Sequence, residues 1–198
     1  MKSIILKVMQ IYWRWKFSRK AIIGRNVVFG RFSDIHLSAG SKKEDIIIGD
    51  NSRVFGVLKA AGGKITIGKD VHIGPFSTIG AKESVNIKDL SMISTKVDII
   101  DNNNHPVHPD DRFLMNIDGG RPELKTWKYA DSSPIIIGEN TWIGKNSLIL
   151  KGVEIKKNSI VAANSVVTKS VDQNCIVAGN PAKIVKVEID SVNKYFNE

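Results

Sequence analysis

The sequence has almost no cysteine, since Cys175 is the only one in 198 residues. A single thiol cannot form an internal disulfide framework or a thiolate metal cluster, and it fits a reducing, cytoplasmic compartment. Long apolar runs are also missing. The apolar stretch at residues 3–19 is interrupted by Lys7, Gln10 and Arg14, and no small-residue cleavage site follows it. We therefore expect neither a transmembrane span nor a secretory signal there.

Acidic residues are absent from the first 33 positions, which hold eight basic residues. The remaining 165 residues hold 21 basic and 20 acidic side chains, so the net charge of +9 is concentrated at one end of the chain. Binding to nucleic acid is not expected, because the basic segment is short and no recognised binding module surrounds it. The hydrophobic content of 42 % is enough for one domain with a sizeable core.

What the sequence does contain is a repeat of six residues, clearest over residues 137–172. The first position of each repeat is aliphatic: Ile137, Ile143, Ile149, Ile155, Val161 and Val167. A period of six does not keep residues on one face of a helix, but it suits a short strand followed by a turn. Three strands and three turns make one triangular coil of 18 residues, and stacked coils form a β-solenoid.

The same period occurs upstream with interruptions, which we predict to be inserts at 37–47, 57–64 and 100–134. The sequence thus divides into an N-terminal helix at 1–20, a β-solenoid at 21–187 and a tail at 188–198. The insert at 100–134 has too many aromatic and branched residues for plain disorder, so we expect an ordered arm that reaches over a neighbour or forms the rim of a pocket.

Residues 3–19 predict a basic amphipathic helix, because Ile5, Val8, Tyr12 and Trp15 recur at helical spacing. Two interpretations stay open. The helix makes peripheral contact with an anionic membrane face, or it packs on its own or a neighbouring subunit's solenoid.

Residues 18 apart share one outward face of the solenoid. Trp142 and Ile160 share one face and Leu148 and Val166 another, so two faces are apolar. Apolar outer faces need cover, and a three-sided prism favours a closed homotrimer.

The repeats together with His105-Pro106-Val107-His108, residues 137–144 (IGENTWIG), 166–170 (VVTKS) and 178–183 (AGNPAK) resemble the hexapeptide-repeat acetyltransferases. The resemblance covers roughly residues 65–187 and is closest to the enzymes that O-acetylate sugars and polysaccharides. It implies an all-β fold, a left-handed parallel β-helix with an extruded active-site loop. It also implies a trimer, acetyl-CoA as donor, no metal, and an active site between adjacent subunits.

The resemblance assigns His105 as the catalytic general base, a role that imidazole can play because it is mostly neutral near pH 7. Asp101, Asn102 or a loop carbonyl could orient its ring. Asn103, His108 and Trp142 are the candidate substrate contacts. The residues implied to bind acetyl-CoA are Trp142, Ala163, Thr168, Lys169, Lys183 and Lys186.

The expected reaction is acetyl transfer to a hydroxyl of a sugar or surface polysaccharide of the capsule or O-antigen type, with a lipid-linked acceptor as one option. N-acetylation of an amino sugar nucleotide is the alternative. More remote are serine acetylation, a non-catalytic scaffold, and a γ-class carbonic anhydrase with zinc on His72, His105 and His108.

Overall fold

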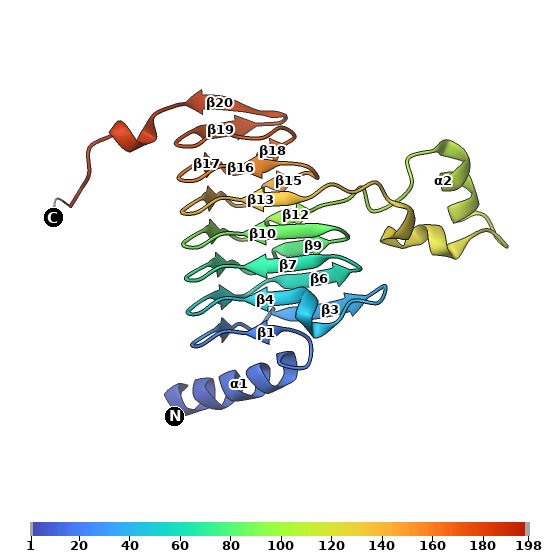
Figure 1. The fold of residues 1–198 in the computed structure, drawn as a ribbon, viewed down its shortest axis with the longest axis horizontal. Coiled ribbons are helices and arrows are strands. Elements are labelled where there is room, and N and C mark those ends of the chain that lie inside the picture. The colour runs from blue at the N-terminus through green and yellow to red at the C-terminus, as the bar shows by residue number, and fades with distance from the viewer. Residues whose placement is uncertain (1, 197–198) are drawn as a thin grey trace.

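The computed structural model describes residues 2–196 and shows a three-sided stack of parallel strands with a helix at one end and an arm at the side (Figure 1). The positions 1, 197 and 198 of the predicted N-terminal helix and C-terminal tail lie outside the described residues. The predicted β-solenoid is therefore present, and its strands up to residue 167 alternate among three sheets in chain order.

Each sheet is one side of the prism and receives one strand from each coil except the last, whose two strands both join the second sheet. The first contains β1 (Ile22–Ile23), β4 (Ile46–Ile48), β7 (Lys64–Ile67), β10 (Ser84–Ile87), β13 (Ile135–Ile137) and β16 (Glu154–Ile155). The second contains β2 (Val28–Phe29), β5 (Arg53–Val54), β8 (His72–Ile73), β11 (Met92–Ile93), β14 (Trp142–Ile143), β17 (Ile160–Val161), β19 (Ile176–Gly179) and β20 (Ala182–Lys186). The third contains β3 (Asp34–Ser38), β6 (Val57–Ala61), β9 (Thr78–Ala81), β12 (Asp98–Ile100), β15 (Leu148–Ile149) and β18 (Val166–Val167). Among the strands of residues 2–196, only β20 runs antiparallel, as a hairpin on β19.

The hexapeptide pattern is explained by what each position does in the coil. The aliphatic first positions over 137–167 point inward and are at most 1 % exposed. The small polar fifth positions are buried too, and their hydroxyls bond to backbone, as in Thr141 Oγ1 to Gly138 O at 2.8 Å. The asparagines at the fourth positions adopt left-handed backbone angles at the corners. Their amides bond from coil to coil, as in Asn146 to Asn164 at 2.9 Å.

One predicted insert is wrong. Residues 57–61 form the regular strand β6, which pairs in register with β3 and β9. The period of six is broken there because the strand is five residues long and is followed by a short turn, not because the chain leaves the coil. The insert at 37–47 is only partial, since β3 continues to Ser38 and a 3-10 helix, η1 (Lys43–Asp45), precedes β4.

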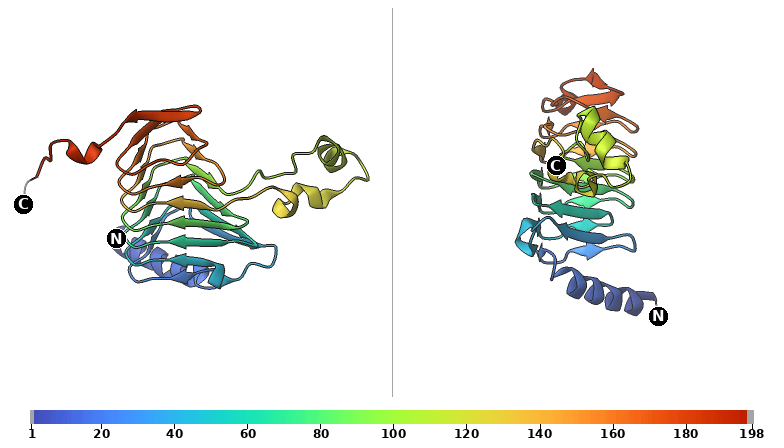
Figure 2. Two further views of the ribbon diagram at one scale, coloured as in Figure 1. Left: turned by 45° about the horizontal axis from the view of Figure 1, so that its top comes forward. Right: turned by 90° about the vertical axis from the view of Figure 1, so that its right-hand side faces the viewer.

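The insert at 100–134 is an ordered arm, as predicted. It leaves the prism at the corner after β12, returns at β13, and stands out from the side of the stack (Figure 2). It contains the helix α2 (Pro109–Asn116) and the 3-10 helices η2 (Pro122–Lys125) and η3 (Trp127–Tyr129). Beyond β20 the tail contains the 3-10 helix η4 (Ile189–Ser191).

The helix α1 (Lys2–Phe17) lies across the first coil and closes that end of the core (Figure 2). Phe17 is completely buried, with its ring centroid 4.8 Å from that of Phe29. Gln10 pairs with the backbone of Phe29 through both of its amide atoms, donating at 2.8 Å and accepting at 3.0 Å. The interpretation that α1 packs on its own solenoid is therefore confirmed.

Charged side chains also hold α1 and the residues after it against the solenoid. Lys20 Nζ donates to Ile35 O at 2.6 Å, and Lys16 Nζ lies 3.6 Å from Asp34 Oδ1. Partial burial raises the pKa of Asp34, but the Ile35 N–H and the charges of His36, Lys16 and Lys20 outweigh it, so the pKa lies below the ordinary value. No helix among residues 2–196 is long and apolar enough to cross a membrane.

Candidate active site

The root of the arm is clamped to the solenoid by Asp101. This side chain is completely buried, and its two oxygens accept from the backbone N–H groups of Lys82 and Glu83 at 2.8 and 2.7 Å. Asn102 Nδ2 donates to Asp101 Oδ1 at 3.1 Å, and Ser133 N donates to Asp101 O at 2.9 Å. The outgoing and returning strands of the arm are therefore held together at the corner.

This clamp uses the two side chains that the sequence offered as orienting groups for His105. The carboxylate of Asp101 bonds to the preceding coil, and Asn102 Oδ1 accepts from Asn104 N at 2.8 Å. Neither side chain is hydrogen-bonded to the imidazole of His105. Both stabilise the backbone turn that carries it.

His105 lies in the first turn of the arm and is exposed. Its backbone N–H donates to Asn103 O at 2.7 Å, and Asn103 N donates to Asp131 O at 3.0 Å, so the turn is tied to the returning strand. Within residues 2–196 the imidazole has no hydrogen-bond partner, which leaves both ring nitrogens accessible. The side chain of Asn103, two residues earlier, is exposed as well.

Trp127 joins the arm to the third sheet. Its Nε1 donates to Asn104 Oδ1 at 3.0 Å, and its ring lies so close to Gly80 that a Cβ there would be 2.6 Å from Cη2. Glycine on β9 is therefore needed for this contact. Lys82 Nζ donates to the carbonyl of Ala130 on the same side of the arm.

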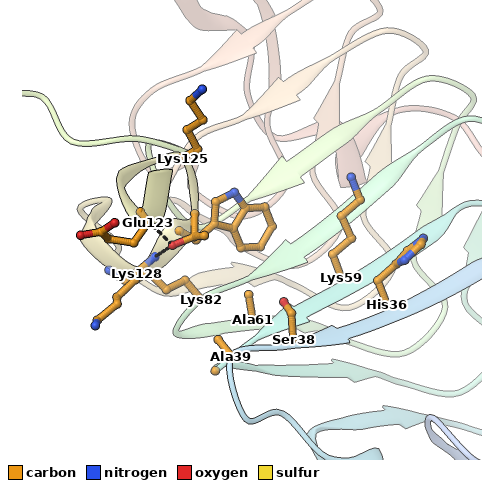
Figure 3. A pocket seen from close by; sticks show the side chains of 12 residues that line it. His36, Ser38, Ala39, Lys59, Ala61, Lys82, Glu123, Lys125 and Lys128 are labelled. Atoms are coloured by element: carbon orange, nitrogen blue, oxygen red, sulfur yellow. Dashed lines mark hydrogen bonds between the residues drawn. The ribbon is translucent and has the colours of Figure 1, made fainter. Parts of the chain in front are cut away.

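The angle between the arm and the third sheet encloses a cavity of about 980 Å³ (Figure 3). Five basic side chains line it and only one acid, Glu123. His36 and Lys59 come from β3 and β6, opposite Lys125 and Lys128 on the arm. The full lining is His36, Ser38, Ala39, Lys59, Ala61, Gly62, Lys82, Glu123, Lys125, Thr126, Trp127 and Lys128. The cavity suits an anionic ligand.

The other histidines have structural partners. His108 is the N-cap of α2, with Nδ1 accepting from Asp110 N at 3.3 Å. Burial, and then the positive charge of Arg53, lower the pKa of His72, whose ring packs edge-on against Phe55 on the second sheet. Among the residues that the structure describes, no three histidine, cysteine or acidic side chains are grouped to hold a metal ion.

The predicted donor residues fall in two places. Trp142 is on the outward face of β14, and its Nε1 donates to Ser94 Oγ at 3.1 Å. Ala163 is exposed in the turn after β17, the next strand of the same sheet, and Lys183 and Lys186 are exposed on β20 further along it. These four residues follow one side of the prism toward its C-terminal end.

Thr168 and Lys169 lie at a different corner, after β18 of the third sheet. The arm leaves from this same edge of the third sheet, after β12. The third sheet thus separates His105 from Trp142 and Ala163 within one chain. The structure brings together Trp142 and Ala163, but it does not bring either of them to His105.

Sequence reasoning missed the side chains that shape the cavity. Lys59, Lys82 and Trp127 are far apart in sequence and meet only because coils stack and the arm folds back. One signal could have indicated the clamp: Asp101 directly follows two aliphatic residues at the point where the repeat stops. A carboxylate at the end of a buried strand needs partners, and here it finds two backbone N–H groups.

The fold and site define a class, the β-solenoid acyltransferases with an extruded histidine-bearing arm. Residues 134–169 match the family described as the hexapeptide repeat of succinyl-transferase. The galactoside O-acetyltransferase of Escherichia coli (strain K12) is 30 % identical over 89 % of this chain and 83 % of its own length. The chain therefore belongs to the hexapeptide-repeat acetyltransferase family, which confirms the predicted class of acyl-CoA-dependent acyltransferases.

A second relative is the WbbJ protein of Escherichia coli (strain K12), named for O-acetyl transfer in lipopolysaccharide biosynthesis. It is 36 % identical over 63 % of this chain and 61 % of its own length, so this chain spans less than two thirds of that relative.

Two solved structures share the fold, which confirms the left-handed parallel β-helix. A point mutant of the N-acyltransferase AntD from Bacillus cereus, in complex with dTDP and coenzyme A, has a TM-score of 0.68 at 23 % identity, over 90 % of this chain and 88 % of that one. Galactoside acetyltransferase in complex with coenzyme A has a TM-score of 0.56 at 26 % identity, over 89 % and 70 %.

Proposed function

We propose that this chain is an acetyl-CoA-dependent O-acetyltransferase acting on a hydroxyl of a sugar or surface polysaccharide, of the capsule or O-antigen type. The observation that carries the proposal is His105, an exposed imidazole without a partner among residues 2–196, held on a clamped turn beside a basic cavity. The two O-acetyltransferase relatives and the solved complexes with coenzyme A support the choice of acceptor group and donor.

The chemistry needs one base. A sugar hydroxyl is a weak nucleophile at neutral pH, and His105 takes its proton as the oxygen attacks the thioester carbon. The resulting imidazolium returns the proton to the departing thiolate. The products are the acetyl ester and free coenzyme A thiol, so no acyl-enzyme forms and no second nucleophile is required.

The donor site that we propose lies along Trp142, Ala163, Lys183 and Lys186. Ala163 and Trp142 line the groove for the pantetheine chain and acetyl group, and the lysines on β20 neutralise the phosphates of coenzyme A as point charges. Thr168 and Lys169 lie at the corner from which the arm leaves, so they would line this groove from a neighbouring copy.

Because His105 and Trp142 are on different sides of one prism, we propose that the working unit is a homotrimer. Each arm then reaches over the neighbouring prism, and His105 of one copy meets the donor groove of the next. The half-exposed apolar side chains of the second sheet, Met92 and Trp142 among them, would be covered by this association.

The basic cavity supports an acceptor with negative charge. It lies beside the turn that carries His105, and Asn104 of that turn contacts Trp127 in its wall. Asn103 and His108 are the proposed acceptor contacts on the arm. A phosphate of a lipid-linked acceptor, or a carboxylate of an acidic polysaccharide, would be neutralised by Lys59, Lys125 and Lys128.

We assign residues 1–20 to an end helix and residues 21–187 to the catalytic β-helix, with its arm at 100–134. Residues 188–198 are assigned to a tail. The buried thiol of Cys175 supports a cytoplasmic location. Peripheral contact with the inner face of a membrane would involve residues 1–20.

The test is a panel of sugars, oligosaccharides and amino sugar nucleotides incubated with acetyl-CoA, with release of thiol as the signal. Acetylated products are then treated with mild base, which cleaves esters but leaves amides intact. We expect thiol release with a hydroxyl acceptor and a base-labile product. A base-stable product formed only from amino sugars would overturn O-transfer in favour of N-acetylation, and no turnover with any member would overturn both.

A further inference from the structure

The outward face of α1 carries a stripe of apolar side chains that nothing in the described chain covers. Ile5, Val8, Ile11, Tyr12 and Trp15 are each between 56 % and 69 % exposed. At about 100° per residue they fall within an arc of about 120°, and the buried Phe17 is on the opposite side of the helix. The helix therefore has two apolar faces, one that packs on the core and one that is exposed to solvent.

An apolar outer face is unexpected at this place in the fold. A solenoid ends in a cap because its last coil would otherwise expose the core, and a cap in water needs a polar outer surface. Here α1 closes the core with Phe17 and Gln10 but presents isoleucine, valine and aromatic rings to solvent. The apolar outer face of this cap therefore indicates a binding surface rather than a solvent-facing one.

The charges around the stripe indicate which surface. Lys7 and Arg14 lie along one border of the stripe, and Arg19 stacks over the ring of Trp15 at 4.4 Å. Residues 1–33 hold eight bases and no acid. Trp15 and Tyr12 carry an apolar body and a polar atom, which is the composition favoured at the headgroup level of a bilayer.

We propose that the outward face of α1 docks on a bilayer that contains anionic lipid. The apolar stripe enters the boundary between headgroups and acyl chains, and the bases contact the acidic headgroups. A second copy of this face is a poor occupant, since pairing two of them brings two all-basic segments together without a carboxylate between them.

The position of α1 at the end of the prism defines how the solenoid would be oriented on the bilayer. The helix α1 lies across the end of the prism, so a helix lying flat on a bilayer stands the solenoid upright (Figure 2). His105 leaves the fourth coil, three coil spacings from the first, which puts it on the order of 25 Å from the outer face of α1. If the proposed trimer forms, three such helices lie at one end and bind together, which raises the affinity by avidity.

The docking is tested by sedimentation of the full chain with vesicles. We expect the protein to bind vesicles with about 30 % phosphatidylglycerol in phosphatidylcholine, to bind pure phosphatidylcholine much less, and to be released by salt. The double variant Ile11→Glu with Trp15→Glu changes only exposed positions, and it should lower the bound fraction at least about tenfold. Tyr195→Glu, at an exposed aromatic residue in the C-terminal tail, is the matched control and should bind as the wild type does.

Equal binding by the double variant and the wild type would overturn the proposal, as would equal binding to neutral and anionic vesicles. Sedimentation equilibrium without lipid tests the competing occupant. A wild-type mass twice that of the double variant would show that α1 pairs with a second copy instead. Acetyl transfer to a soluble acceptor should be unchanged in the double variant, so failure of docking and failure of the proposed enzyme activity give different results.

Discussion

At the scale of single residues, the structure separates the proposed general base from the groups that hold its turn in place. His105 is exposed and unpaired within residues 2–196, whereas Asp101, four residues earlier, is completely buried and fully bonded. A base needs access to its substrate, and the turn that carries it needs rigidity. The arm meets both needs by placing the buried carboxylate at its root.

Replacing His105 with Ala is expected to lower the rate of acetyl transfer by about 10²–10⁴-fold, because general base catalysis is worth that much. Thermal unfolding and binding of coenzyme A should be unchanged, since the imidazole supports no described contact. His108→Ala should cost less than about tenfold, because that ring caps α2. A His105→Ala enzyme with wild-type turnover would contradict the assignment.

Replacing Asp101 with Asn is expected to lower the free energy of unfolding by about 2–3 kcal/mol. The amide has one acceptor oxygen, so one of the two N–H groups of Lys82 and Glu83 would face a donor in a buried place. Urea denaturation measures the change. Asp98→Asn, at an exposed position on β12, is the control and should stay within about 0.5 kcal/mol of the wild type. Equal stability of the two variants would show that the clamp is dispensable.

At the scale of elements, α1 is a cap whose inner contacts are specific. Phe17 fills the end of the core against Phe29, and Gln10 supplies the donor and acceptor that the first strand of the second sheet lacks on its open side. The stability of the first coils therefore depends on a helix that comes before them in the chain.

Truncating Phe17 to Ala should destabilise the protein by about 3–5 kcal/mol, as for other fully buried phenylalanines. Trp15→Ala removes a larger ring two residues away on the outward face and should cost less than about 1 kcal/mol. Chemical denaturation of both variants gives the comparison. Similar losses for both would mean that the outward face of α1 is covered within the protein.

At the scale of the whole molecule, one chain contains the residues of the proposed site on different sides of the prism. The third sheet lies between the arm with His105 and the proposed donor groove at Trp142 and Ala163. The proposed trimer closes this gap by symmetry, since each copy gives its arm to one neighbour and its groove to the other.

Mixed trimers test this arrangement. Ala163→Trp should block the donor groove and His105→Ala should remove the base, so each variant alone is inactive. Unfolding and refolding the two in equal amounts should restore about a quarter of the wild-type activity, since each site draws its base and its groove independently from the two variants. Thiol release measures the recovery. A mixture that stays inactive, although the subunits exchange, would place the complete site in one chain.

The sequence by itself determined the solenoid, because a period of six with an inward aliphatic side chain and a small polar partner satisfies only a short strand and a tight corner. It indicated the ordered arm and the amphipathic helix for similar local reasons, whereas His105 was assigned through the family resemblance. It misjudged residues 57–64, where a strand of five residues interrupts the period without leaving the coil.

Only the tertiary structure decided what lies beside what. Coil stacking and the folded arm bring Lys59, Lys82 and Trp127 to one cavity from distant parts of the chain. It also showed that Asp101 and Asn102 accept from backbone N–H groups, and that within residues 2–196 the His105 imidazole has no hydrogen-bond partner. The two faces of α1 were distinguished in the same way, because helical spacing shows that a helix is amphipathic but not which side meets the core. Residues that meet only because the coils stack are far apart in the chain, so no local sequence pattern shows that they are neighbours.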